Sequence, residues 1–186
     1  VLVSGRVATA RTEGKTSIVT YTGELPRGDW DMVVEMTPQL SSGRDQIEIG
    51  LYGDYNNYLA SGIWTQGGYH DDDWAKSCFG VQIVKMQRGE RTFDDGYVGA
   101  SACPWNAAHG NAQIVMGGER GIDTEVYRGL VSDVEAGITF TLRKRGRNYS
   151  GVVETVNGTR YETPEISAIR PPGPPMISVG KWYESP

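Results

Sequence analysis

The sequence has no long apolar run, few histidines and cysteines, and no extended helical period. No apolar stretch approaches the roughly 20 residues that a bilayer-spanning helix needs, so no membrane span is predicted. The two histidines and two cysteines lack the spacing of zinc ligands. Eighteen basic against twenty-three acidic residues leave a net charge of −5, which argues against nucleic acid as a partner. The lack of a helical apolar period of ten residues or more argues against a helical bundle.

Glycine and proline, in contrast, are abundant. Twenty-five glycines and nine prolines are scattered between short apolar runs, a distribution typical of many short strands joined by turns. A chain of 186 residues fits one domain, residues 1–186, that buries roughly 70% of its unfolded surface. About twelve strand segments at roughly 8–12-residue spacing predict an all-β fold in which two antiparallel sheets form a sandwich.

Residues 138–161 give the clearest strand signal. Phe140 and Leu142 alternate with polar residues, the period of a half-buried strand. The chain then reverses at Arg145-Gly146-Arg147, and Asn157-Gly158 suits the two positive φ angles of a type I′ hairpin turn. These residues predict a meander of three antiparallel strands.

Residues 46–52 alternate equally clearly. Ile47, Ile49 and Leu51 are predicted to point inward, and Glu48 and Tyr52 outward. Another strand is predicted over residues 124–130. Residues 132–136 are expected to form at most one helical turn.

Three segments together resemble the concanavalin A-like jelly rolls. They are IEIGLYGDYNNYLASGIW (47–64), FTLRKRGRNYSGVVETVNGTRYE (140–162) and PPMISVGKW (174–182). The resemblance covers about half the chain, residues 29–64 and 138–182. Within it, the chain is similar to the jelly-roll domains appended to bacterial glycoside hydrolases and to laminin-G-like modules. It implies a two-sheet jelly-roll β-sandwich, with sugar ligands on the concave sheet or on loops at one edge. The paired acids of catalytic members, spaced Glu-x-Asp-x-x-Glu, are absent, as are the lyase signatures of this fold, which argues against catalysis.

The aromatic residues fit such a sugar site. Five tryptophans and ten tyrosines outnumber three phenylalanines, and indole or phenol rings stack on the C–H faces of sugars while amides and carboxylates bind the hydroxyls. The alternative is that these rings pack in the core. The predicted ligand-binding residues lie in or beside two long polar segments: Trp64, Tyr69, Trp74, Trp105, Asp72, Asp73 and Asn106.

Three consecutive carboxylates raise the question of a metal. Asp71, Asp72 and Asp73 carry hard oxygen ligands of the kind that Ca²⁺ prefers. They lack the spacing of a calcium-binding loop, and a solvated acidic segment is the alternative. Calcium is therefore the one cofactor that the sequence raises.

Two further groups of charges could form sites. Glu35 and Glu48 could lie on neighbouring strands and act as an acid/base pair if their carboxyls were roughly 5–9 Å apart. Arg143 and Arg145 share one strand face, with Glu48 or Glu154 as cross-strand partners. This basic run is expected to be a solvated sheet face, and an anionic-ligand site is the alternative.

The cysteine count and two triplets favour an exported protein. Cys78 and Cys103 could form a disulfide worth on the order of 3 kcal/mol. Asn148-Tyr149-Ser150 and Asn157-Gly158-Thr159 match the glycosylation pattern. The chain begins at Val1, so a processed or excised segment is expected, secreted or extracellular.

These observations predict an extracellular, non-catalytic module that binds oligo- or polysaccharide. Two alternatives stay open. One is a glycoside hydrolase or polysaccharide lyase that uses Glu35 and Glu48, and the other is an adhesion or structural module that contacts another protein. The absence of a catalytic signature favours binding over catalysis.

Overall fold

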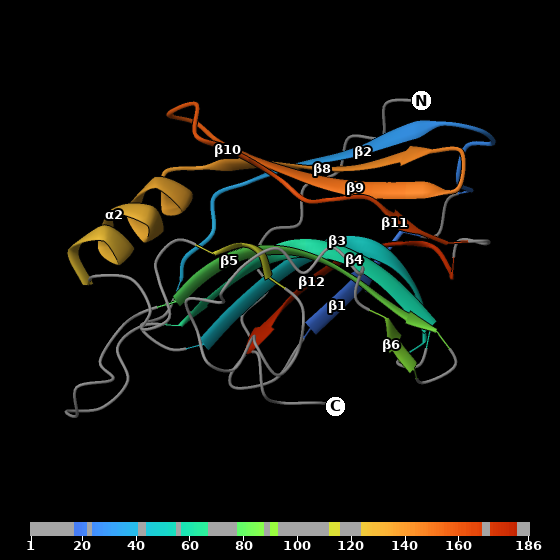
Figure 1. Ribbon diagram of the computed structural model, residues 1–186, viewed down its shortest axis with the longest axis horizontal. Helices are drawn as coiled ribbons and strands as arrows, with labels where there is room; N and C mark the ends of the chain where they lie inside the picture. Colours follow the sequence, from blue (N-terminus) through green and yellow to red (C-terminus); the bar gives the residue numbers. More distant parts are fainter. Residues whose placement is uncertain are drawn as a thin grey trace.

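Two antiparallel sheets pack face to face, and the helix α2 (Thr124–Glu135) lies at one end of the pair (Figure 1). This arrangement confirms the predicted all-β, two-sheet antiparallel sandwich. The structure, a computed structural model, describes residues 17–21, 24–40, 44–54, 57–66, 78–87, 90–92, 112–115, 124–168 and 172–181.

The larger sheet has seven strands in the order β1-β12-β3-β4-β5-β6, and β7 also pairs with β5. Strand β12, late in the sequence, lies between β1 and β3. The bounds are β1 Ser17–Thr20, β3 Arg44–Asp54, β4 Asn57–Gln66, β5 Cys78–Gln87, β6 Glu90–Thr92, β7 Ala112–Val115 and β12 Pro175–Lys181.

The smaller sheet has five strands in the order β10-β9-β8-β2, and β11 also pairs with β9. Its bounds are β2 Trp30–Met36, β8 Ile138–Arg145, β9 Asn148–Thr155, β10 Arg160–Glu162 and β11 Ile166–Ser167. Strands β8, β9 and β10 are the meander that the sequence predicts. The first turn has two residues between strands, but the second spans Val156–Thr159, so the predicted two-residue type I′ turn is wrong there.

The core lies between the two sheets. Ile47, Ile49 and Leu51 are at most 3% exposed, which confirms their predicted inward orientation. The rings of Phe79 and Tyr161, from opposite sheets, lie 5.6 Å apart between centroids, within the range of a favourable aromatic pair. Alternating apolar residues on the facing strands therefore hold the sandwich together.

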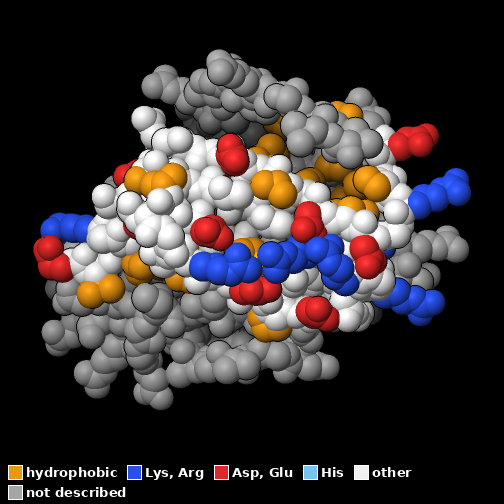
Figure 2. All heavy atoms as spheres, turned by 90° about the horizontal axis from the view of Figure 1, so that it is seen from above, with side chains coloured by type: hydrophobic (Ala, Val, Ile, Leu, Met, Phe, Trp, Pro, Cys, Tyr) orange, Lys and Arg blue, Asp and Glu red, His pale blue; other side chains and the backbone are white. Residues whose placement is uncertain are grey.

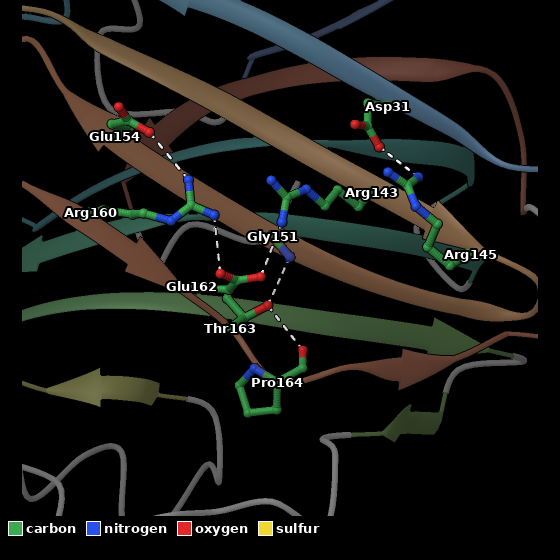
Figure 3. Close-up of polar contacts among 9 residues, drawn as sticks. All are labelled: Asp31, Arg143, Arg145, Gly151, Glu154, Arg160, Glu162, Thr163 and Pro164. Carbon is green, nitrogen blue, oxygen red and sulfur yellow. Dashed lines mark hydrogen bonds and ion pairs between the residues drawn. The ribbon is translucent and has the colours of Figure 1, made fainter. Parts of the chain in front are cut away.

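The two sheets come close together where Gly151 of β9 faces Ser61 of β4. A Cβ added at Gly151 would lie 1.7 Å from Ser61 Oγ and 2.5 Å from Ser61 Cβ. The backbone N–H of Gly151 donates to Thr163 Oγ1 at 2.8 Å, and the Thr163 hydroxyl donates to the Pro164 carbonyl at 3.0 Å (Figure 3). Glycine is needed here because any side chain would occupy the space of the serine.

A helix, α2 (Thr124–Glu135), occupies a region where the sequence analysis predicts a strand and then a short turn. That prediction is wrong. Tyr127, Leu130, Val131 and Val134 recur at the i, i+3, i+4, i+7 spacing of one helix face, and all four pack in the core cluster. Gly137, with φ of 135°, follows the helix, and its N–H bonds to the Val134 carbonyl at 3.1 Å.

Three contacts fix α2 to the rest of the sandwich. Glu135 accepts a hydrogen bond from the Leu40 N–H at 2.8 Å. Asn157 Nδ2, in the β9–β10 turn, donates to Asp133 Oδ1 at 2.5 Å. The N–H of Val156 in the same turn donates to the Gly137 carbonyl at 3.0 Å. The turn and the end of the helix are therefore linked through both side chains and backbone.

The bonds to Asp133 make stability depend on pH. Burial alone would raise the pKa of Asp133, but hydrogen bonds from Asn157, Thr155 and Thr159 outweigh it and lower this pKa. A carboxyl with a lowered folded pKa stabilises the fold above its unfolded pKa, and this contribution is lost as the pH falls through the folded pKa. Below roughly pH 4 we expect the Tm of the native chain to fall more than that of Asp133→Asn. If thermal melts show that the Tm of the native chain and the Tm of Asp133→Asn fall equally with pH, this expectation is contradicted.

The outward face of the five-stranded sheet carries a row of basic side chains flanked by acidic ones (Figure 2). Arg160 bonds to Glu154 at 3.2 Å and to Glu162 at 3.1 Å, and Arg143 also reaches Glu162 at 3.1 Å (Figure 3). These side chains are partly exposed, so each pair contributes little to stability on its own.

Arg143 and Arg145 lie on one face, as the sequence predicts, but their partners differ from the expected ones. Arg145 pairs with Asp31 of β2 at 2.7 Å, and its hydrogen bond to this carboxylate raises the pKa of Arg145. Glu48, one of the expected partners, is a residue of the other sheet. The basic run is therefore compensated by carboxylates of its own sheet.

Among the described residues, the helix α2 is too short and too polar to cross a membrane.

Candidate active site

A buried polar row crosses the seven-stranded sheet on the side that faces away from the core. Ser178 of β12 lies opposite Glu48 of β3, which lies opposite Gly62 of β4, which lies opposite Gln82 of β5. Because the neighbouring residues of each strand point into the core, these four positions share the outward face. We call this set the Glu48 row.

The Glu48 carboxylate is the centre of the row. It is 6% exposed, and Gln82 is 2% exposed. Gln82 Nε2 donates to Glu48 Oε1 at 3.2 Å, and Gln46 Nε2 on the same strand donates to the same oxygen at 2.5 Å. A buried carboxylate is costly unless hydrogen bonds replace its hydration, and the two carboxamides supply them.

Gly62 permits the contact between Glu48 and Gln82, which come from strands that are not neighbours. A Cβ at Gly62 would lie 2.7 Å from Glu48 Cγ and 2.1 Å from the Ile47 carbonyl oxygen. Any side chain here would therefore separate the carboxylate from the carboxamide. Glycine inside a strand is otherwise unfavourable and often marks a place of close approach.

The next row on the same face is apolar. Ala60, Val84 and Met176 form a small buried cluster, against which Tyr52 and Tyr58 pack. Register places Gly50 and Ala60 beside Glu48 and Gly62. The Glu48 row is thus bordered on one side by small and apolar groups, which raise the cost of leaving its polar atoms unpaired.

One atom of the row lacks a partner within the described part of the chain. Gln82 Oε1 is buried and makes no hydrogen bond there. Nε2 of the same carboxamide carries two N–H groups, of which Glu48 takes one. The Gln82 carboxamide therefore offers an acceptor and a second N–H donor beside the carboxylate.

Comparison with known proteins gives a likeness in structure alone. No protein-family model and no curated protein matches the sequence. One solved structure that matches is SCP-B, a member of the eqolisin family of peptidases, in complex with the tripeptide Ala-Ile-His. It is 11% identical over 94% of this chain and 67% of that chain, with a TM-score of 0.40. Scytalido-glutamic peptidase with a peptide-based transition-state analogue is 12% identical over 94% of this chain and 68% of that chain, with the same TM-score of 0.40.

These matches correct the function predicted from the sequence. The non-catalytic, carbohydrate-binding module expected from the sequence is contradicted by these matches, both of which are described as peptidases. The resemblance to concanavalin A-like jelly rolls stays a prediction, as does secretion.

The predicted pair of acids is not brought together. Glu48 lies on β3 of the seven-stranded sheet, whereas Glu35 lies on β2 of the five-stranded sheet, opposite Thr139. Glu35 is exposed and Glu48 is buried. The two carboxyls therefore belong to different sheets and cannot occupy neighbouring strands.

Most of the other predicted site residues lie outside the described residues: Tyr69, Asp71, Asp72, Asp73, Trp74, Trp105 and Asn106. Trp64 lies in β4, in register with Gln46 of β3 and Gly80 of β5, and its side chain is not described. No group of three or more possible metal ligands occurs among the described residues, and the predicted calcium ligands are not among them.

The predicted disulfide is likewise untested. Cys78 begins β5, but its side chain and the whole of Cys103 lie outside the described residues. The Cys78–Cys103 bond remains a prediction.

Sequence reasoning placed Glu48 outward but missed its partners. Gln46 was visible as the polar residue two positions before Glu48, on the same strand face. Gln82 lies 34 positions from Glu48, and only the register of three strands brings them together. The signal within β5 is a glutamine between Val81 and Ile83, both of which are buried.

Proposed function

We propose that the chain is a hydrolase that cleaves peptide bonds, with Glu48 as general base and the Gln82 carboxamide as oxyanion donor. The observation that carries the proposal is the buried contact of 3.2 Å between Gln82 Nε2 and Glu48 Oε1 across Gly62. A carboxylate that accepts a proton, next to an N–H that can bind a developing oxyanion, is what hydrolysis of a carbonyl compound requires.

The reaction balances with these two groups and water. Glu48 takes a proton from a water molecule as its oxygen attacks the carbonyl carbon, and the second N–H of Gln82 stabilises the resulting oxyanion. The C–N bond then breaks, and the protonated Glu48 gives its proton to the leaving amine. The products are a carboxylic acid and an amine, and the carboxylate is restored.

Peptides fit this arrangement better than glycosides. Hydrolysis of a glycoside normally uses two carboxyl groups that flank the bond, and the Glu48 row contains one. A peptide offers both a carbonyl oxygen for the Gln82 N–H and an amide N–H for Gln82 Oε1, which has no hydrogen-bond partner among the described residues. The carboxamide could thus bind both polar atoms of a substrate backbone.

Access to the row decides when the reaction can occur. Glu48 and Gln82 are nearly fully buried, so the reaction requires that a substrate and one water molecule enter the Glu48 row. Burial then excludes bulk water and strengthens the electrostatic interactions within the site.

A peptide-library digest tests the proposed function. We expect the native chain to cleave peptides of a mixed library across a range of pH, with new termini identified by mass spectrometry. The same preparation should leave a panel of oligosaccharides intact. Intact peptides at every pH, from a chain shown to be folded by its circular dichroism, would refute the proposal.

A further inference from the structure

A second reactive feature lies in the β9–β10 turn, far along the chain from Glu48 and in the other sheet. Asn157 and Gly158 are exposed, and Gly158 has a φ of 87°. A Cβ added at Gly158 would meet no atom within 4 Å. No neighbouring atom therefore crowds Gly158 on the side where a Cβ would stand.

Asparagine followed by glycine undergoes a known intramolecular reaction. The backbone nitrogen of the glycine loses its proton and attacks the asparagine Cγ, so that a C–N bond forms. The Cγ–Nδ2 bond breaks, and Nδ2 takes up a proton and leaves as ammonia. Water then opens the cyclic imide to aspartate or isoaspartate. Glycine favours the attack because it has no side chain to block the nitrogen and allows a wide range of backbone angles.

We propose that Asn157-Gly158 is a deamidation site that Asp133 restrains in the folded protein, and that the reaction detaches α2 from the β9–β10 turn. Asn157 Nδ2, the leaving group, is held by Asp133 Oδ1 at 2.5 Å. The attacking nitrogen of Gly158 donates to the Thr155 carbonyl at 3.0 Å. Both reacting groups are thus engaged elsewhere, and the reaction needs these bonds to open.

Deamidation would turn the attraction between residues 157 and 133 into a repulsion. Aspartate at position 157 carries a negative charge and no N–H, so the donor to Asp133 is replaced by a second carboxylate. Like charges at hydrogen-bond distance repel. The neighbouring bond from Val156 to Gly137 also lies in this turn, and α2 carries the core residues Tyr127 and Val134. Deamidation would therefore loosen the helix that closes this end of the core.

The first experiment measures the reaction rate in the full chain. The native protein, Asp133→Ala and Asp133→Asn are incubated folded at mildly alkaline pH, and mass spectrometry follows the mass gain and isoaspartate content of the peptide that contains Asn157. Loss of the charged partner in Asp133→Ala should speed deamidation by roughly three- to tenfold. The side chain of Asp133→Asn can still accept a hydrogen bond through its amide oxygen. Its deamidation rate should therefore lie between those of the native chain and Asp133→Ala.

A matched control is available where β3 ends and β4 begins. Asn57 donates to Asp54 at 2.9 and 3.0 Å, but Tyr58 follows it in place of glycine. Asp54→Ala should leave the rate at Asn57 negligible. Equal deamidation rates at Asn157 in the native chain and Asp133→Ala would show that Asp133 does not restrain the reaction. The absence of a mass gain at Asn157 in every variant would show that Asn157 is not a deamidation site.

The second experiment separates repulsion from loss of the bond. Asn157→Ala removes the hydrogen bond alone, whereas Asn157→Asp adds the charge that deamidation creates. Thermal melts at neutral pH should show a lower Tm for Asn157→Asp than for Asn157→Ala. Equal values would contradict the proposed detachment of α2.

Discussion

Replacing Glu48 with glutamine is expected to lower kcat/KM for peptide cleavage by roughly 10²–10⁴-fold, the usual contribution of a general base. Glutamine has nearly the same size and can still accept from Gln82 and Gln46 through its amide oxygen. It cannot take a proton from water. Because the loss would fall on the chemical step, we expect it mainly in kcat, measured on a peptide that the native chain cleaves.

Glu35→Gln is the matched control for this substitution. It makes the same chemical change on β2, in the five-stranded sheet, where Glu35 is exposed. We expect full activity from this variant and the native Tm from both. A Glu48→Gln protein that retains native activity would rule out the carboxylate as the base, and a Glu35→Gln protein that loses activity would place the site on the other sheet.

Replacing Gly151 with alanine is expected to destabilise the fold by about 3 kcal/mol, near the upper end of the usual range for overpacking. The added methyl would overlap Ser61, whose Oγ would lie 1.7 Å and whose Cβ would lie 2.5 Å from the new carbon. Neither strand can yield easily, because β4 and β9 are both interior strands. For a chain of this size the loss corresponds to a Tm lower by roughly 6–12 °C.

The double variant Gly151→Ala with Ser61→Gly tests this cause. Removing the serine side chain gives the new methyl group room, so the double variant should recover most of the lost stability relative to Gly151→Ala. Urea unfolding of the four proteins gives the coupling free energy. Additive losses would show that the methyl group clashes with something other than Ser61.

Alternation was sufficient to predict the strands, because each strand buries one face. Ile47, Ile49 and Leu51 on β3 and Phe140 and Leu142 on β8 are all buried in the core, and their spacing is visible in the sequence. The alternation of apolar and polar residues predicts which side chains point inward, but it does not predict which strands become neighbours. Glu35 and Glu48 both alternate with apolar residues, and only the topology shows that they belong to different sheets.

The helix was missed for a different reason. Residues 124–131 contain several residues that favour strands, among them Val126 and Tyr127, and local propensity is easily overridden by packing. The spacing of Tyr127, Leu130 and Val134 was the better signal. For the site, the charge of Glu48 was visible, but its burial and its carboxamide partners depend on register across β3, β4 and β5.

The position of β12 between β1 and β3 constrains the order in which the sandwich can assemble. Synthesis proceeds from the N-terminus, so β1 emerges early but finds its neighbour only when residues 175–181 have left the ribosome. Until then β3 presents an unpaired edge. Contacts between segments so distant along the chain slow folding. The strand that carries Glu48 is thus completed last, by a segment more than 120 residues downstream of it.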